Sequence, residues 1–106
     1  MSTGLRRVEA PVSTVLADGM ACRVAEPDAV MLLRTGLERL VRVTDDEVAA
    51  AMKHLFTDTH NTAEGAGAAA FAAAMQERGR LAGRTVGVVL SGGNVDHDMF
   101  AQVLQR

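Results

Sequence analysis

Residues 84–94 read Arg84-Thr-Val-Gly-Val-Val-Leu90-Ser91-Gly92-Gly93-Asn94. The apolar run up to Leu90 is typical of a strand buried in the centre of a parallel sheet. It ends in a serine and two glycines, and the spacing of later apolar residues predicts a helix after the turn: Met99, Phe100, Val103 and Leu104. Open α/β sheets bind ligands at the carboxyl ends of their strands. This stretch therefore predicts both the fold class and the first candidate site.

The residues before this stretch predict three helices and one further strand. An alanine-rich helix is expected over 62–78, with apolar residues nearly all round and a cap at Gly79. Before it, Thr44-Asp-Asp-Glu47 is a capping box that opens a helix, and its apolar stripe consists of Val48, Ala51, Met52, Leu55 and Phe56. This helix should end near residues 58–61. Residues 40–43 form a short segment with two β-branched valines, which indicates a strand. Pro27 suits the start of the earliest helix.

The resulting order is helix, strand, helix, helix, strand, helix over residues 26–106. Alternation of this kind predicts an α/β fold with a short parallel sheet. Residues 1–25 show no sustained period and are interpreted as an N-terminal arm or loop, with a short strand near residues 20–24.

Bulk composition excludes several classes of protein. With 106 residues, 48% of them hydrophobic and 23% charged, the chain suits one soluble domain whose core is built from small side chains. A net charge of −2 gives no reason to expect nucleic acid or an anionic membrane as partner. The start of the chain does not resemble a secretory signal, and the longest apolar run, over residues 66–75, is shorter than a membrane span. The single cysteine, Cys22, is interpreted as a buried small hydrophobe in a reducing cytoplasm.

Two segments are candidates for chemistry. The glycines at 92 and 93 admit close backbone approach of a ligand, although any turn from strand to helix favours glycine, and Asn94 would also serve as an ordinary N-cap. Glu64, at the start of the alanine-rich helix, either faces a site or complements the helix dipole.

Three segments together resemble the threonine dehydratase and serine racemase family of pyridoxal-phosphate (PLP) enzymes. They are Ala17-Asp-Gly19, Glu64-Gly-Ala-Gly-Ala68 and Val88-Val-Leu-Ser-Gly-Gly-Asn94, in this order and with similar gaps. The resemblance implies part of the large domain of the tryptophan synthase beta-like fold. It also implies that Ser91 hydrogen-bonds the pyridine nitrogen of PLP, that Gly92 and Gly93 admit the ring edge, and that Glu64 lies near the ring.

The chain also departs from that family. The resemblance implies a Schiff-base lysine in a Ser-x-Lys-x-Arg-Gly segment and a glycine-rich phosphate loop, and neither motif is present. The single lysine, Lys53, falls on the polar face of its helix and should be solvated and protonated. Where many relatives have proline, this chain has Gly65. We therefore expect a fragment or truncated relative of a threonine or serine ammonia-lyase, with no catalytic residue, no bound PLP and no activity on its own.

Two other functions remain open. The chain could be a non-catalytic module that associates with itself or a partner, or a small phosphate-binding domain using the Ser91 turn. Because its apolar helix and strand lack internal cover, we expect a homo-oligomer, in the simplest case a dimer, or a complementary enzyme fragment as partner. His54, Asp58 and His60 make a poor metal set, so no metal is expected, and residues 96–98 are interpreted as surface charge.

Overall fold

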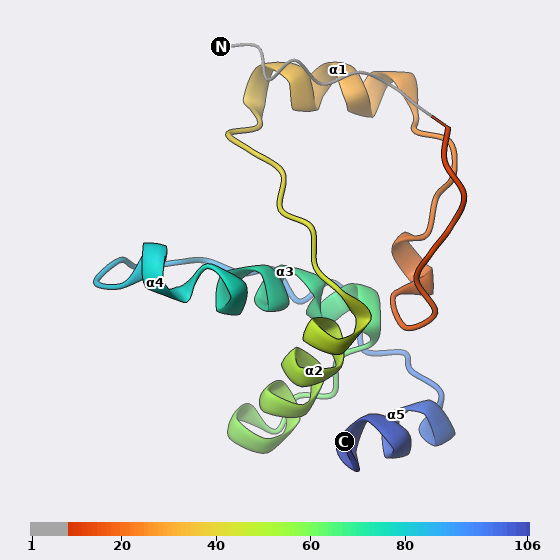
Figure 1. The fold of residues 1–106 in the computed structure, drawn as a ribbon, viewed down its shortest axis with the longest axis vertical. Helices are drawn as coiled ribbons and strands as arrows, with labels where there is room; N and C mark the ends of the chain where they lie inside the picture. Colours follow the sequence, from red (N-terminus) through yellow and green to blue (C-terminus); the bar gives the residue numbers. More distant parts are fainter. Residues whose placement is uncertain (1–8) are drawn as a thin grey trace. The chain divides into compact units, whose positions relative to one another are not determined.

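The computed structural model describes residues 9–106, and these form two compact units. The first unit contains residues 9–13 and Ala21–Arg42, and the second contains Thr14–Met20 and Val43–Arg106. Figure 1 shows the path of the chain through both. The first eight residues of the predicted arm, with the expected absence of a secretory signal there, lie outside the described residues.

The first unit is built around one helix, α1 (Pro27–Gly36), which begins at Pro27 as predicted. A single antiparallel bridge joins Glu9 to Val24, and beside it the Ala10 amide donates to the Arg23 carbonyl at 3.1 Å. Val30 is the buried residue of α1. Cys22 is exposed, so its interpretation as a buried hydrophobe is wrong. The reason is that this unit encloses too little apolar surface to cover a side chain in its connecting loop.

The second unit contains a short 3-10 helix, η1 (Asp18–Met20), and four α-helices: α2 (Asp45–Thr59), α3 (Gly65–Gln76), α4 (Arg78–Leu81) and α5 (His97–Leu104). The predicted capping box opens α2. The Thr44 hydroxyl accepts from the Glu47 amide at 3.1 Å, and the Glu47 carboxylate accepts from the Thr44 amide at 2.9 Å. The helix ends at His60, whose left-handed conformation (φ 57°) stops it within the predicted range.

The core of this unit lies where α2 and α3 pack together, with α5 against α2. Met52 is fully buried, and most of its buried neighbours are small: Leu16, Val48, Ala49, Ala51, Ala63, Ala68, Ala72 and Val103. At the edge the rings of Phe56 and Phe100 meet edge to face, with centroids 5.3 Å apart. The prediction of a core made from small side chains is confirmed.

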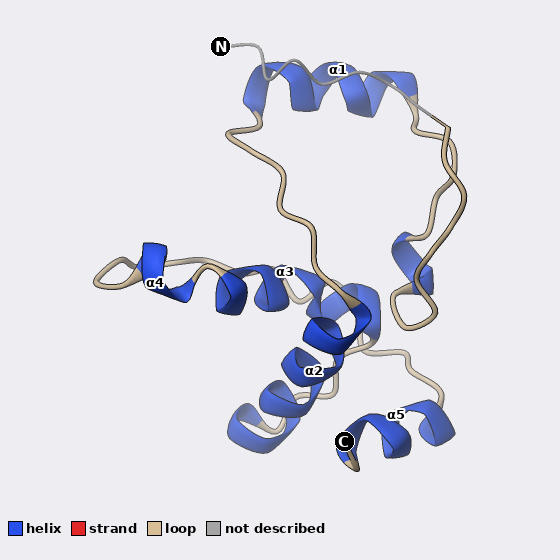
Figure 2. Ribbon diagram, in the orientation of Figure 1, coloured by secondary structure: helices blue, strands red, loops and turns tan. Residues whose placement is uncertain are grey.

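The predicted parallel sheet is contradicted. Across residues 9–106 the structure contains helices, loops and one isolated bridge, but no strand (Figure 2). Residues 85–90 have no regular secondary structure, none of the described segments forms a backbone hydrogen bond with them, and Val89 is 76% exposed. Residues 40–42 belong to the other unit. A strand needs a neighbour to form its ladder, and the apolar pattern indicated burial without supplying that neighbour.

Two predicted helix ends also differ. Asp96, rather than Asn94, caps α5, and its carboxylate accepts from the Met99 amide at 3.2 Å. The alanine-rich helix ends at Gln76, and Gly79 lies inside the short α4 that follows. Over the described residues, no helix combines the length and the apolar character that a membrane crossing requires.

Candidate functional site

The two segments singled out from the sequence lie side by side. Glu64 is the N-cap of α3, and its amide donates to the Gly92 carbonyl at 3.0 Å. Its side chain does not cap the helix; a Cβ added to Gly92 would collide with Glu64 Oε1. The carboxylate therefore lies directly against the turn that follows residues 84–90. Of the two readings of Glu64, this geometry agrees with a side chain that faces the turn.

Three further glycines, Gly19, Gly65 and Gly67, lie where backbone segments pack closely around the N-terminal end of α3. A Cβ on Gly67 would collide with the Gly92 carbonyl oxygen, and one on Gly65 would collide with the Leu16 carbonyl oxygen. A Cβ on Gly19 would lie 3.2 Å from the Ala66 Cβ and 4.0 Å from Glu64 Oε2. The N-terminal end of α3 is thus in contact with two segments distant in sequence, and only glycine fits at the crossing points. We call Gly19, Glu64, Gly67, Ser91 and Gly92 the glycine cluster.

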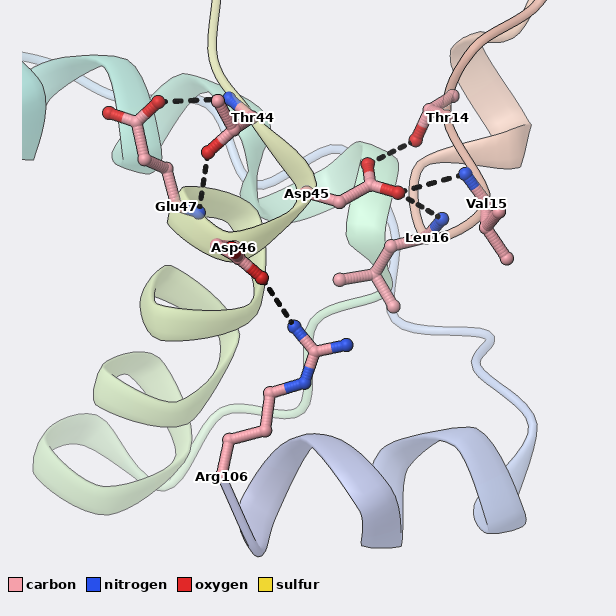
Figure 3. A network of polar contacts seen from close by, with 8 residues as sticks. All are labelled: Thr14, Val15, Leu16, Thr44, Asp45, Asp46, Glu47 and Arg106. Atoms are coloured by element: carbon pink, nitrogen blue, oxygen red, sulfur yellow. Dashed lines mark hydrogen bonds and ion pairs between the residues drawn. The ribbon is translucent and has the colours of Figure 1, made fainter.

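Asp45, the first residue of α2, holds the segment that carries Gly19 (Figure 3). Its carboxylate accepts from the Thr14 hydroxyl, from the Val15 amide at 2.9 Å and from the Leu16 amide at 3.3 Å. The Thr14 hydroxyl in turn accepts from the Ala17 amide at 3.0 Å. These bonds, led by that of Thr14, lower the pKa of Asp45 below its ordinary value, because they stabilise the ionised carboxylate.

The other two carboxylates in the first turn of α2, those of Glu47 and Asp46, make no described contact with the Thr14 segment. The pKa of Glu47 is lowered, first by the Thr44 amide and then by the Gln76 side chain, which donates at 3.0 Å. Asp46 points away from the capping box and pairs with Arg106 at 3.3 Å (Figure 3).

The Ser91 side chain is exposed, and within the described part of the chain its hydroxyl has no hydrogen-bond partner. An uncommitted hydroxyl is a neutral donor, which is the chemistry that a pyridine nitrogen accepts. The two glycines that follow pack closely against the protein: a Cβ on Gly92 would collide with Glu64 Oε1, and one on Gly93 would collide with the Thr62 carbonyl oxygen. The exposed Ser91 hydroxyl is thus held at the end of a closely packed segment, and its chemistry fits the nitrogen of a flat heteroaromatic ring. The cluster does not by itself supply a group for a phosphate or an aldehyde.

Lys53 belongs to a different surface. It is half-buried, its ammonium donates to the Arg106 main-chain carbonyl, and with Asp46, His54 and Val103 it lines a pocket of about 470 Å³. The prediction that Lys53 is solvated and protonated stays a prediction; an ammonium that donates to a carbonyl at the surface agrees with it. His54 pairs with Asp58 at 3.4 Å, and no group of three possible metal ligands occurs among residues 9–106.

Sequence reasoning placed Asp45 only inside a capping box and missed its bonds to the Thr14 segment. The signal that was available is the acidic pair Asp45-Asp46. The first turn of the helix thus carries two carboxylates that the capping box does not need, and short-range rules say nothing about a partner 31 residues away.

Comparison with known proteins identifies the family. The family model described as "Pyridoxal-phosphate dependent enzyme" matches residues 1–92. The chain therefore belongs to the family of pyridoxal-phosphate-dependent enzymes, and PLP is the cofactor of that family.

Similar curated proteins narrow the likeness within the family. An L-threonine ammonia-lyase of Geobacter sulfurreducens is 37% identical over 93% of this chain and 25% of its own length. A phenylserine dehydratase of Ralstonia pickettii is 40% identical over 84% of this chain and 28% of its own length. The biosynthetic L-threonine dehydratase IlvA of Burkholderia multivorans is 33% identical over 95% of this chain and 20% of its own length. The chain thus spans about a quarter of the curated relatives that it matches.

Proposed function

We propose that this chain is the ring-binding part of a PLP-dependent ammonia-lyase that converts 3-hydroxy amino acids to 2-oxo acids and ammonia. The observation that carries the proposal is the contact of Glu64 with the Gly92 turn, directly beside the exposed Ser91 hydroxyl. Threonine and phenylserine, which two of the similar proteins are named after, both carry a hydroxyl on the β-carbon. That shared group supports a 3-hydroxy amino acid as substrate class.

Within this proposal each of the four predicted cofactor-binding residues has a physical task. PLP, when bound, supplies an electron sink for the substrate's α-carbon. The Ser91 hydroxyl donates a hydrogen bond to the pyridine nitrogen, and because the donor is uncharged, the nitrogen stays largely unprotonated. Gly92 and Gly93 let the ring edge approach the backbone. The Glu64 side chain packs against the Ser91 turn and places a carboxylate near the ring.

Anchoring of the cofactor through a lysine and binding of its phosphate are assigned to another part of the enzyme. The one lysine of the 106 residues, Lys53, lines a pocket with Arg106, and its amine is engaged by a carbonyl. We therefore propose that the anchoring lysine and the phosphate loop come from a complementary part of the enzyme, and that these 106 residues do not catalyse the reaction alone. A cytoplasmic location is part of the same proposal.

A non-catalytic, self-associating module is the second candidate, and a specific observation favours it. The extended residues 84–90 run back along α3 and α4 and leave large apolar side chains open: Val86, Val88, Val89 and Leu90. An unpaired apolar segment of this kind favours pairing with another chain. In this second reading the partner is another copy, in the simplest case in a dimer. In the first it is the complementary fragment.

Measurement of 2-oxo acid release from threonine separates these readings. The purified chain should release none with PLP present. Mixed with the lysine-bearing remainder of the Geobacter relative, it should regain turnover, and Ser91→Ala should reduce that turnover while Ser13→Ala, on an exposed loop, should not. Turnover by the chain alone would contradict the proposal, and a chain that forms dimers with itself but does not bind the complementary fragment would favour the self-associating module.

A further inference from the structure

We propose that Asp45 is a positioning residue of the glycine cluster: it fixes the Thr14–Met20 segment against the start of α3, and thereby fixes Glu64. The inference rests on the proposed function only in treating the cluster as a cofactor site. Asp45 itself touches neither Glu64 nor Ser91 in any described contact, so its effect must pass through the segment that it holds.

The first step of the argument is the number of bonds on one carboxylate. Asp45 accepts three hydrogen bonds, from Thr14, Val15 and Leu16, so both of its oxygens are engaged (Figure 3). Its neighbour Asp46 makes one ion pair with Arg106 and none with this segment. A capping role alone needs only the Thr44 and Glu47 groups, which already satisfy each other. The contacts of Asp45 are therefore additional to those that start the helix.

The second step is the contact between the held segment and α3. Leu16 and Ala17 are buried, and the Leu16 carbonyl lies where only a glycine, Gly65, can pass. The Met20 amide donates to the Ala17 carbonyl at 3.1 Å, which closes the turn carrying Gly19. Asp45 thus fixes the position of this turn relative to the start of α3.

The third step reaches Glu64. Its Oε1 lies against Gly92, and its Oε2 lies 4.0 Å from the position that a Cβ on Gly19 would take, so the half-buried carboxylate lies between the held segment and the Ser91 turn. Within the described residues it has no hydrogen bond from a side chain that would fix it otherwise. If the Thr14–Met20 segment moves away, the Glu64 carboxylate loses its neighbour on that side and can turn outwards.

Nuclear magnetic resonance of the 106-residue chain tests the inference. Asp45→Asn weakens the three bonds, and the matched control is Asp46→Asn. Because hydrogen bonds to a charged group stabilise by about 1.5–3 kcal/mol, amide exchange at Val15 and Leu16 should accelerate about tenfold or more in Asp45→Asn. The carboxyl carbon signal of Glu64 should move in the same variant. Neither change should occur in Asp46→Asn.

A second pair of variants guards against loss of folding. Thr14→Val removes the hydroxyl that bonds Asp45, whereas Thr14→Ser keeps it. The Glu64 signal should move in Thr14→Val and return to its native position in Thr14→Ser. Faster exchange at Val15 with an unmoved Glu64 signal in both Asp45→Asn and Thr14→Val would overturn the inference, since the bonds would then hold only their own loop.

Titration with pyridoxine 5′-phosphate separates this inference from the proposed function. This probe lacks the aldehyde of PLP, so it cannot react with Lys53. Binding at Ser91 in the wild type that is several-fold weaker in Asp45→Asn supports both. Binding that is equal in the two proteins overturns the positioning role alone. If the wild type binds no probe even when it is mixed with the lysine-bearing remainder of the Geobacter relative, that result counts against the proposed function, and the Glu64 signal then decides the role of Asp45.

Discussion

Replacing Gly67 by alanine tests the crossing of α3 with the Ser91 turn. An added Cβ would collide with the Gly92 carbonyl oxygen and would lie 3.0 Å from its nitrogen and 3.2 Å from its carbonyl carbon. These are backbone atoms, so they cannot turn aside as a side chain would. The turn must move, and the 3.0 Å hydrogen bond from the Glu64 amide to the Gly92 carbonyl is then weakened or lost.

The magnitude follows from three terms. Overpacking of this kind costs about 1–3 kcal/mol, and the lost hydrogen bond costs about 1 kcal/mol. Alanine is favoured over glycine inside a helix by about 1 kcal/mol, which offsets part of the loss. The net destabilisation should be about 1–3 kcal/mol, which corresponds to a fall in Tm of roughly 5–20 °C for a domain of this size.

Gly79→Ala is the matched control, because it makes the same chemical change in a helix where an added Cβ meets nothing within 4 Å. It should leave stability unchanged or raise it by up to about 1 kcal/mol. Thermal unfolding followed by circular dichroism measures both variants. A Gly67→Ala protein as stable as the wild type would refute the close crossing on which the geometry of the site depends.

Three further predictions concern stability, pH and association. Met52→Ala empties a fully buried position and should reduce the free energy of unfolding by about 2–5 kcal/mol in urea titrations; a loss below 1 kcal/mol would mean that the core between α2 and α3 is not closed. Because hydrogen bonds lower the folded-state pKa of Asp45, its contribution to stability is complete above its unfolded pKa, near 3.8, and is lost as the pH falls through the lower folded value. The stability difference between wild type and Asp45→Asn should therefore shrink on acidification, and a difference independent of pH in urea titrations would contradict the assigned bonds. Light scattering after size-exclusion chromatography should show self-association that Val89→Glu weakens, since Val89 is 76% exposed; a stable wild-type monomer at micromolar concentration would count against it.

Local rules predicted the parts of the fold that local forces determine. The Thr44 capping box, the end of α2 near His60 and the start of α1 at Pro27 each depend on groups a few residues apart. The prediction of a sheet was wrong because a strand depends on a partner that the pattern of residues 84–90 cannot specify. The predicted burial of Cys22 was wrong for a related reason, since burial of a side chain depends on how much surface the surrounding unit can cover.

In the candidate site, too, local motifs predicted some residues and missed those that depend on long-range contacts. Glu64 and the Ser91 turn were singled out from motif order, and the structure brings Glu64 against Gly92. The roles assigned to Ser91, Gly92, Gly93 and Glu64 at a cofactor ring remain predictions. The acidic pair Asp45-Asp46 is visible in the sequence, but the partner of Asp45 could not be found from it, because the bond to Thr14 spans 31 residues and follows no local pattern.

The most direct test of the central claim is a residue-by-residue titration with pyridoxine 5′-phosphate of the isotope-labelled chain, mixed with the lysine-bearing remainder of the Geobacter relative. A binding edge for the pyridine ring at the glycine cluster predicts the largest amide shifts at Ser91, Gly92 and Gly93, with a smaller shift at Glu64, and all of them should vanish in Ser91→Ala. Shifts confined to the pocket of Lys53 and Arg106, or shifts that persist in Ser91→Ala, would contradict the claim.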